Sequence, residues 1–471
     1  MEKSVPTRRI LDDLAEIVAI PSVYSTPSDG APYGEDCRRA LEWFTEKAKS
    51  YGLTAVNVDN YAAYAEIGEG KECIGVLAHL DVVPAGSGWA TDPFKMIEEN
   101  GKVYGRGVGD DKGSVVVCLH ALAAIKNSGV KLKRRIRLIV GADEERGSSC
   151  IRYYLENGGE VPAMSFVPDS EFPVINSEKG ISHIKFRFDD KKLLENISYI
   201  DGAQCMNAVP DSSTVKVVPG SRLEAALKSV CGGAVTDDIF KKPPAVNAII
   251  SSGSAIKDFS VTVGDCITIS AVGTAEHAST PEKGDSALWK NLTFLAAYND
   301  AIGSEYLEKI VDYMCTPLSS GKLGIYVDDE KSGDLTMCMS EAGIEDGKLS
   351  LAVDFRLPLG IKPEFVTEKI CGILGCSATV LDYHENLYID PDAPLIKTLL
   401  EVYRDVTGDM TAPLKTGGGT YARELPNAVA FGCTPVELDI NMHRADENFP
   451  VAQLFKNYDI YLAAMLKLAN L

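Results

Sequence analysis

Histidine and acidic residues follow apolar segments of this chain, at the points where buried strands would end. Residues 73–78 form an apolar run typical of a strand buried on both faces, and His79 and Asp81 follow it. Side chains two apart in a strand point the same way, so this imidazole and carboxylate should lie side by side. Such a carboxylate orients a metal-ligating histidine. Taken alone, the pair is more typical of an ordinary solvated strand end.

Two further apolar runs end in acids. Residues 136–141 predict a buried strand, and the acids Asp143, Glu144 and Glu145 crowd its carboxyl end. Residues 163–168 predict another strand, which Asp169 follows. A run of charged residues, taken alone, usually indicates a solvated turn. Because open α/β sheets carry their chemistry at the carboxyl ends of strands, the repeated pattern predicts one site along one sheet edge.

Two glycine-rich loops need separate interpretation. Residues 105–114 contain Asp110 and Asp111 and open a helix that stops at Gly129. A phosphate cradle is disfavoured there, because the Walker spacing is absent and two adjacent acids repel phosphate. The loop at residues 415–425 has three glycines whose backbone N–H groups could meet a ligand, but a tight turn without a ligand is an equally good interpretation.

The candidate residues suit a divalent cation such as Zn²⁺ or Mn²⁺, because they offer imidazole and carboxylate without thiolate. The candidate ligands are His79, Asp110, Glu145, Asp169 and His443. Five ligands are too many for one tetrahedral site with an open position, but they suit two sites that share one carboxylate. Asp110 is the natural bridge because it lies in a turn next to a helix N-terminus. Two cations roughly 3.5–4 Å apart would lower the pKa of a shared water toward about 7. Glu144 is left over to act as the base.

The helices and strands that must position these residues divide the chain into two expected domains. Helical periodicity predicts helices over residues 9–20 and 35–51, and the α/β character returns in a helix that starts after residue 394. Residues 190–385 mix short strands and modest helices without acidic strand ends. We therefore expect a discontinuous domain of residues 1–181 and 387–471, with a second domain of residues 182–386 inserted into it.

Composition excludes several classes of protein. The 471 residues carry a net charge of −20, with a pI near 4.8, which argues against nucleic acid and against an anionic membrane surface as partners. No run is long enough to span a bilayer, and the start has no apolar signal core, so we expect a cytoplasmic protein. The twelve cysteines contain no C-x-x-C pair and suggest free thiols.

Several motifs in order resemble one family along nearly the whole chain. The motifs are HLDVVPAG, GRGVGDDKG, ADEERGSS, VPDSEFP, GTAEHASTP and GGGTYAR, followed by the late His443. Together they resemble the aminoacylase/carboxypeptidase family of two-metal peptidases, and most closely its PepV-type dipeptidase branch, which includes manganese-dependent enzymes. The resemblance implies an α/β fold, with a mixed-sheet, zinc-peptidase-like catalytic domain and a large inserted α+β lid domain.

The resemblance also implies roles at the metal site. His79 and Asp169 would bind one metal, Glu145 and His443 would bind the other, and Asp110 would bridge the two. The peptide bond between Asp110 and Asp111 would be cis. Asp81 would orient His79, and Glu144 would act as the base and proton shuttle.

Further roles are implied for the inserted domain. His277 would stabilise the tetrahedral oxyanion, while Asn207 and Arg356 would hold the carboxylate end of the substrate, helped by Gly418 and Gly419. Without the family, an exposed turn histidine and a salt bridge from Arg356 to Asp354 would be the better interpretations. The large lid resembles that of the long-lid branch, which implies a monomer.

The sequence therefore predicts a metallo-dipeptidase that hydrolyses unblocked dipeptides with two divalent metal ions, Zn or Mn, through a metal-bridging water activated by Glu144. An N-acyl amino-acid deacylase, such as a desuccinylase, would use the same metals with a different pocket. A catalytically dead binding protein is disfavoured because none of the five ligands is missing. A nucleotide-binding protein is disfavoured because no phosphate loop is complete.

Overall fold

The computed structural model describes residues 7–203, 205–231, 259–316 and 319–471. It divides the chain into two compact units, one of Met1–Glu178 with Leu387–Leu471 and one of Lys179–Asn386. The division falls after residue 178, where the sequence interpretation placed it after residue 181, because Gly180–Phe188 (β10) pairs along its length with Lys348–Leu357 (β16) of the second unit. Residues 232–258 of the predicted inserted domain lie outside the described residues.

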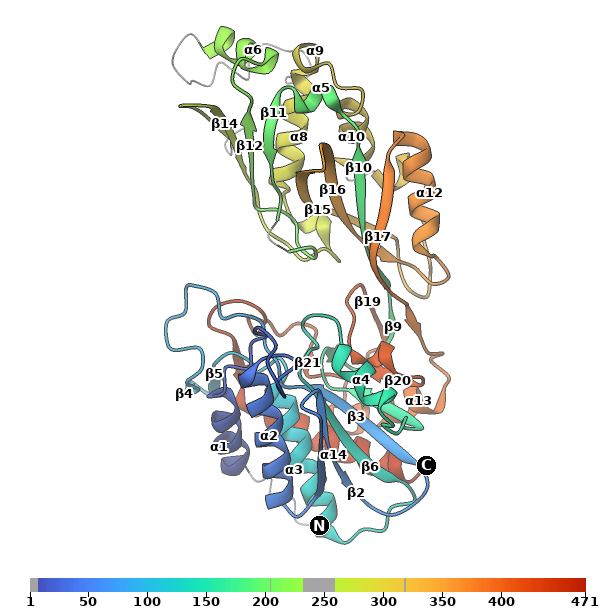
Figure 1. The fold of residues 1–471 in the computed structure, drawn as a ribbon. Coiled ribbons are helices and arrows are strands. Elements are labelled where there is room, and N and C mark those ends of the chain that lie inside the picture. Colours follow the sequence, from blue (N-terminus) through green and yellow to red (C-terminus); the bar gives the residue numbers. More distant parts are fainter. Residues whose placement is uncertain (1–6, 204, 232–258, 317–318) are drawn as a thin grey trace. The chain divides into compact units, whose positions relative to one another are not determined.

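A nine-stranded mixed sheet forms the centre of the first unit (Figure 1). Its order is β1-β2-β6-β3-β7-β20-β9-β18, with β19 also paired to β9. The strands are Thr54–Val58 (β1), Ala62–Ile67 (β2), Arg135–Gly141 (β6), Cys73–His79 (β3), Met164–Val167 (β7), Ala428–Ala430 (β20), Ile175–Glu178 (β9), Leu387–Tyr388 (β18) and Leu414–Thr416 (β19). β6, β3, β7 and β20 run parallel, β19 pairs parallel with β9, and the remaining pairs of this sheet are antiparallel. The predicted α/β fold with a mixed sheet is confirmed.

The register of the parallel strands explains why the acidic strand ends meet. Every residue of β3 is buried, as expected for an apolar strand covered on both faces. His79, the last residue of β3, pairs with Gly141, the last residue of β6. Val76 of β3 pairs with Phe166 of β7. The residues that follow all three strands therefore leave the same edge of the sheet.

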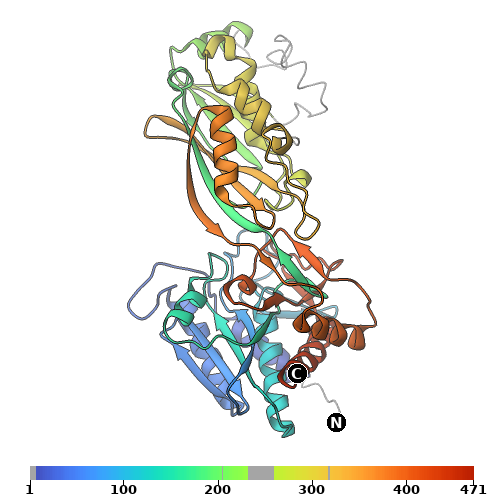
Figure 2. The ribbon, with the colours of Figure 1, turned by 90° about the vertical axis from the view of Figure 1, so that its right-hand side faces the viewer.

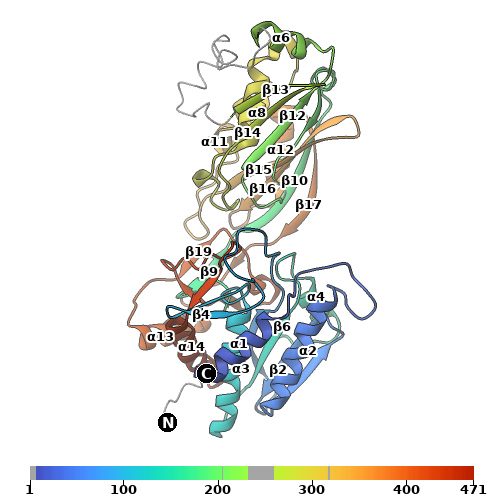
Figure 3. The ribbon, with the colours of Figure 1, turned by 90° about the vertical axis from the view of Figure 1, so that its left-hand side faces the viewer.

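Helices pack on this sheet and on one another (Figure 3). They are Thr7–Val18 (α1), Glu35–Ser50 (α2), Lys112–Ser128 (α3), Ser149–Glu156 (α4), Pro394–Thr407 (α13) and Val451–Ala469 (α14). α3 begins directly after Asp111 and packs against β3, β6, α1 and α14. Its buried His120 bonds Asp13 of α1 at 2.8 Å, so this histidine links two helices of the core.

Smaller elements complete the first unit. They are the three-stranded sheet of Ile97–Glu99 (β4), Lys102–Tyr104 (β5) and Asn448–Pro450 (β22), the pair Glu171–Phe172 (β8) and Thr434–Pro435 (β21), and the 3-10 turn Tyr421–Glu424 (η4). Among the described residues of the whole chain, none of the helices has the length and apolarity that crossing a bilayer requires.

The second unit is an α+β structure with its own hydrophobic core. One sheet has the order β15-β16-β10-β17, and the other has the order β11-β12-β14-β13. Figure 2 shows Pro363–Leu374 (α12), in orange, against β10 and Ser377–His384 (β17). The remaining elements are Lys191–Leu194 (α5), Ile197–Ile200 (β11), Ser212–Val217 (β12), Arg222–Cys231 (α6), Phe259–Val263 (β13), Ile267–Val272 (β14), Pro281–Lys283 (η3), Ala287–Ala297 (α8), Asn299–Ile302 (α9), Leu307–Met314 (α10), Ser319–Lys322 (α11) and Thr336–Glu345 (β15).

A row of charged side chains crosses three strands of the first of these sheets. His183 of β10 is the register partner of both Asp354 on β16 and Asp382 on β17. Its Nε2 lies 3.2 Å from Asp354 and its Nδ1 lies 2.9 Å from Asp382. Burial alone would lower the pKa of His183, but the two carboxylates raise it to about 9. The folded unit therefore prefers the imidazolium form.

We expect this row to stabilise the second unit in a pH-dependent way. An unfolded histidine titrates near 6.5, so the contribution of His183 is complete below that pH and is lost as pH rises through about 9. His183→Asn should cost about 3 kcal/mol of unfolding free energy at pH 6 and much less at pH 10. Denaturant unfolding of both proteins across this range measures the difference. An equal cost at pH 6 and pH 10 would refute the charged pairing.

Candidate metal centre

The structure brings the five predicted ligand side chains together at one edge of the sheet. Nε2 of His79 lies 2.9 Å from Oδ1 of Asp110 and 3.6 Å from Oδ2 of Asp169. Nε2 of His443 lies 2.8 Å from the other Asp110 oxygen and 3.2 Å from Oε2 of Glu145. The two oxygens of Asp110 therefore face two different histidines, which is the arrangement of a bridging carboxylate.

Asp110 lies just before α3, and the predicted cis peptide bond between Asp110 and Asp111 is present in the structure. Asp111 belongs to the cluster as well: its Oδ2 lies 3.3 Å from the backbone nitrogen of His79. Sequence interpretation missed Asp111 as a member of the cluster, because its adjacency to Asp110 is the only signal and neighbouring residues usually point apart.

Asp81 acts differently from the sequence expectation. Its backbone carbonyl, rather than its carboxylate, lies 2.9 Å from Nδ1 of His79, whereas the nearest carboxylate oxygen is 3.5 Å away. Nδ1–H donating to that carbonyl leaves the lone pair of Nε2 directed at the cluster. The Asp81 carboxylate accepts hydrogen bonds from the backbone N–H groups of Glu144 and Glu145, both at 3.1 Å. Asp81 thus orients the imidazole through its backbone and the acidic loop through its side chain.

The residues present fit divalent cations. Two trios have ligand atoms that all lie within 4.8 Å of one another, namely His79 with Asp110 and Glu145, and His79 with Asp111 and Asp169. A carboxylate oxygen and an unprotonated imidazole nitrogen 2.9 Å apart are both electron donors, so a cation between them satisfies both. Oδ1 of Asp111 and Oε1 of Glu145 are buried without a hydrogen-bond partner within the described parts of the chain. Nitrogen and oxygen donors suit Zn²⁺ or Mn²⁺.

The electrostatics reflect crowded negative charge. Burial, reinforced by Asp110, raises the pKa of Asp169 to about 7. Burial would lower the pKa of His443, but its hydrogen bonds to Asp110 and Glu145 raise it to about 11. His79 shifts in the same direction, because hydrogen bonds to Asp110 and Asp81 outweigh its burial and raise its pKa. The raised pKa values of the two histidines reflect the negative charge of the carboxylates around them, which bound cations would neutralise.

The three consecutive acids after β6 have three different environments. Asp143 accepts hydrogen bonds from the backbone and hydroxyl of Ser149 at the start of α4. Glu145 faces His443 in the cluster. The Glu144 carboxylate has no hydrogen-bond partner among the residues described, and burial followed by the charge of Asp169 raises its pKa well above the ordinary value. Within the described residues, Glu144 therefore offers a carboxylate that has no hydrogen-bond partner and has raised basicity beside the cluster.

Three predicted site residues belong to the second unit. Asn207 and His277 are both exposed, and their backbone segments lie side by side. The backbone N–H of Ala278 donates to the carbonyl of Asn207 at 2.9 Å, and Ala208 forms an isolated antiparallel β-bridge with His277. Arg356 is buried and donates from Nε and Nη2 to Asp354, at 2.7 and 2.8 Å. The substrate and oxyanion roles of Asn207, His277 and Arg356 stay predictions.

The predicted glycine-rich loop lies between β19 and η4. Gly418 donates its N–H to the Thr416 hydroxyl at 3.0 Å and accepts from Arg423 at 3.0 Å. A Cβ at Gly419 would lie 2.0 Å from the Arg423 guanidinium, so this position has no room for a side chain. Glu178 accepts hydrogen bonds from the backbone and hydroxyl of Thr420, at 3.1 and 2.7 Å. The loop is rigidly held, and its contact with substrate stays a prediction.

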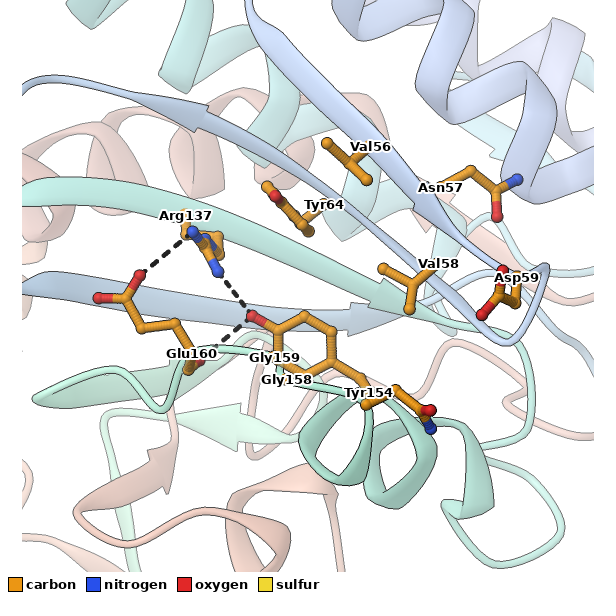
Figure 4. A pocket seen from close by; sticks show the side chains of 11 residues that line it. Val56, Asn57, Val58, Asp59, Tyr64, Arg137, Tyr154, Gly158, Gly159 and Glu160 are labelled. Atoms are coloured by element: carbon orange, nitrogen blue, oxygen red, sulfur yellow. Dashed lines mark hydrogen bonds and ion pairs between the residues drawn. The ribbon is translucent and has the colours of Figure 1, made fainter.

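A separate pocket of about 430 Å³ in the first unit shares no residue with the cluster. Figure 4 shows Arg137, from β6, between Glu160 and Tyr154 at one side of this pocket. The guanidinium bonds the Tyr154 hydroxyl at 2.8 Å and Glu160 at 3.2 Å, and it lies over the Tyr64 ring. The charges of Arg137 and Glu160 thus satisfy each other, which indicates a structural role for this pair.

Comparison with known proteins gives three informative similarities. The model of peptidase family M20/M25/M40 matches residues 75–467. The Beta-Ala-Xaa dipeptidase of Lactobacillus delbrueckii subsp. lactis is 33% identical over 479 residues, which cover 98% of this chain and 96% of that protein. The structure of human carnosine dipeptidase 1 superimposes with a TM-score of 0.59 at 15% identity, covering 99% of this chain and 97% of that one, which supports the fold alone.

Proposed function

The chain belongs to peptidase family M20/M25/M40, and from this membership and the cluster geometry we propose that it is a metal-dependent dipeptidase. The resemblance to two-metal peptidases noted from the sequence motifs is thereby confirmed. The observation that carries the proposal is the position of Asp110, whose two oxygens lie 2.9 and 2.8 Å from His79 and His443. A carboxylate shared in this way suits a pair of cations.

The residues of the cluster divide into two ligand sets. His79 and Asp169 would hold one divalent cation, Glu145 and His443 would hold the other, and Asp110 would contact both. When bound, such ions supply Lewis-acid polarisation of the scissile carbonyl and acidify water for the attack. We propose zinc or manganese as the metal, since the donors are nitrogen and oxygen.

Glu144 supplies the proton transfers in this proposal. Its carboxylate takes a proton from the attacking water and returns it to the leaving amine. Burial and the charge of Asp169 raise its pKa, so this carboxylate is a stronger base than an exposed glutamate. The N–H of Glu144 bonds Asp81, so the loop that carries the base is fixed to the strand that carries His79.

Free dipeptides are the proposed substrates, and the beta-Ala-Xaa relative favours including β-alanyl dipeptides in the proposal. An N-acyl amino-acid deacylase is the second candidate, since it would use the same metals. We expect kcat/KM for free dipeptides to be at least about a hundredfold higher than for matched N-succinyl and N-acetyl amino acids. A pocket that binds an ammonium group leaves its own polar groups unpaired when the substrate has no ammonium group.

The assay uses chelator-treated protein with Mn²⁺ or Zn²⁺ added back. Activity should disappear on chelation and return with the metal. Faster turnover of the N-acyl amino acids would replace the dipeptidase assignment with the deacylase, whereas activity that persists after complete metal removal would refute both.

His277→Ala should lower kcat by about 10²–10³-fold with a smaller effect on KM, the loss typical of removing one oxyanion donor. The side chain is exposed in the second unit, so its removal should leave the melting temperature unchanged. Steady-state kinetics on one dipeptide, with a thermal melt of the same preparation, separates the two effects. A change in KM alone would assign His277 to substrate binding instead.

Two finer properties stay proposals. We propose that a single chain carries the whole activity, because the inserted unit has the size of a domain in its own right. A cytoplasmic location is proposed on the sequence signals alone. Sedimentation of the purified protein tests the first, and fractionation of the source cells tests the second.

A further inference from the structure

Arg106 and Glu447 form a buried ion pair in the first unit. Nη1 of Arg106 lies 2.8 Å from Oε2 of Glu447, and each side chain is 1% exposed. A buried pair of this kind requires further hydrogen bonds to offset its desolvation. Those additional bonds are made to the loop that carries Asp110.

Glu447 accepts hydrogen bonds from three backbone N–H groups of that loop. The donors are Gly107 at 3.0 Å, Gly109 at 3.0 Å and Asp110 itself at 3.3 Å. A Cβ at Gly109 would lie 2.5 Å from the Ile440 side chain, so the loop packs closely against the segment that precedes His443. The Glu447 carboxylate therefore holds the backbone of the bridging residue in place.

The same pair reaches the other two ligand loops. Arg106 Nη2 lies 3.3 Å from the carbonyl of Ala85, in the loop that follows Asp81, and the guanidinium packs over Trp89. Glu447 lies four residues after His443, and its own carbonyl accepts the N–H of Gly105 at 3.1 Å. The loops after β3, before α3 and before β22 thus meet at one ion pair.

The loop around His443 depends on such an anchor more than the other two. His443 is 49% exposed, whereas His79 is fully buried at the end of a central strand. His443 has a φ of 59°, and Asn441 and Asp446 have φ values of 55° and 57°. Left-handed conformations at non-glycine residues persist only where the surroundings impose them.

We propose that Glu447, paired with Arg106, is a positioning residue that fixes His443 against Asp110 and thereby determines the affinity of the cation that His443 binds. This inference rests on the two-cation site of the proposed function. Its consequence should be unequal for the two cations. Glu447 holds both the loop of His443 and the backbone of the shared Asp110, whereas His79 and Asp169 follow strands of the central sheet and do not depend on this contact. Loss of the Glu447 charge should therefore weaken the cation that His443 binds more than the other cation.

Calorimetric titration of chelator-treated protein with Mn²⁺ tests this selectivity. Wild-type protein should bind two equivalents. In Glu447→Gln we expect the affinity for one equivalent to fall by about 10–100-fold, the range found for residues that orient metal ligands, and the affinity for the other to fall by a smaller factor, because Asp110 is shared. Glu447→Asp keeps the charge on a shorter side chain and should recover part of the lost affinity; it also carries the test if the glutamine variant fails to fold.

Asp13→Asn is the matched control. Asp13 is another buried carboxylate of the first unit, bonded to His120 and Lys47 away from the cluster. The Asp13→Asn substitution should lower the melting temperature and leave both cation affinities unchanged. Two wild-type affinities in folded Glu447→Gln, or equal weakening of both cations, would overturn the positioning role alone. Wild-type protein that binds a single cation would instead refute the two-cation site and this inference with it.

Discussion

Glu144→Gln should lower kcat by about 10³-fold or more while the protein keeps both cations, the upper range of the effect of removing a general base. The amide has nearly the size of the carboxylate but cannot accept the proton. Metal content should not change, because the ligand contacts of the cluster are made by Glu145 and not by Glu144. Metal analysis and steady-state kinetics on one preparation measure both properties.

The neighbouring acids provide internal controls for this prediction. Asp143→Asn should keep metal and most activity, since Asp143 bonds Ser149 at the start of α4. Glu145→Gln should lose affinity for the cation that His443 binds. A Glu144→Gln protein with near-normal turnover would remove the assigned base, and one that lost metal would reassign Glu144 as a ligand.

Asp110→Ala should weaken both cations together, in contrast to every other single ligand variant. Within the described residues, Asp110 is the member of the predicted ligand set with an oxygen within 3 Å of each histidine, since Oδ1 lies 2.9 Å from His79 and Oδ2 lies 2.8 Å from His443. Losing the cations removes several kcal/mol of charge stabilisation, so we expect a fall of at least about 10³-fold in kcat/KM. Metal content after dialysis should fall below one ion per chain.

The comparison variant for this prediction is Asp169→Ala, which removes a ligand from one side of the cluster only. It should leave one cation bound with near wild-type affinity. If Asp110→Ala also kept one tightly bound cation, Asp110 would belong to a single site and the bridging assignment would be wrong.

The sheet edge was predictable because strand patterns are local. The apolar runs that became β3, β6 and β7 ended where their periodicity ended, and parallel pairing then brought His79, Glu145 and Asp169 to the same edge. His443 was different: it was a candidate ligand by residue type, but it lies in a polar loop without periodicity, so no strand pattern placed it at this edge and only the resemblance to a family assigned it to one of the two metals.

Side chain to backbone contacts were not predictable. The carboxylate of Asp81 bonds the N–H groups of Glu144 and Glu145, whereas its carbonyl contacts His79. β3 ends at His79, so Asp81 lies beyond the strand, where the alternation of side chains need not hold. Glu447 contacts backbone groups of the Asp110 loop, far away in the sequence. Such contacts carry no residue-type signal on the backbone side, so no pattern in one sequence reveals them.

The most direct test of the central claim is an anomalous-diffraction crystal structure of the Mn²⁺-loaded protein. We expect two peaks roughly 3.5–4 Å apart, with one oxygen of Asp110 bound to each, His79 on one ion and His443 on the other. A single peak, or a second ion that Asp110 does not touch, would contradict the account.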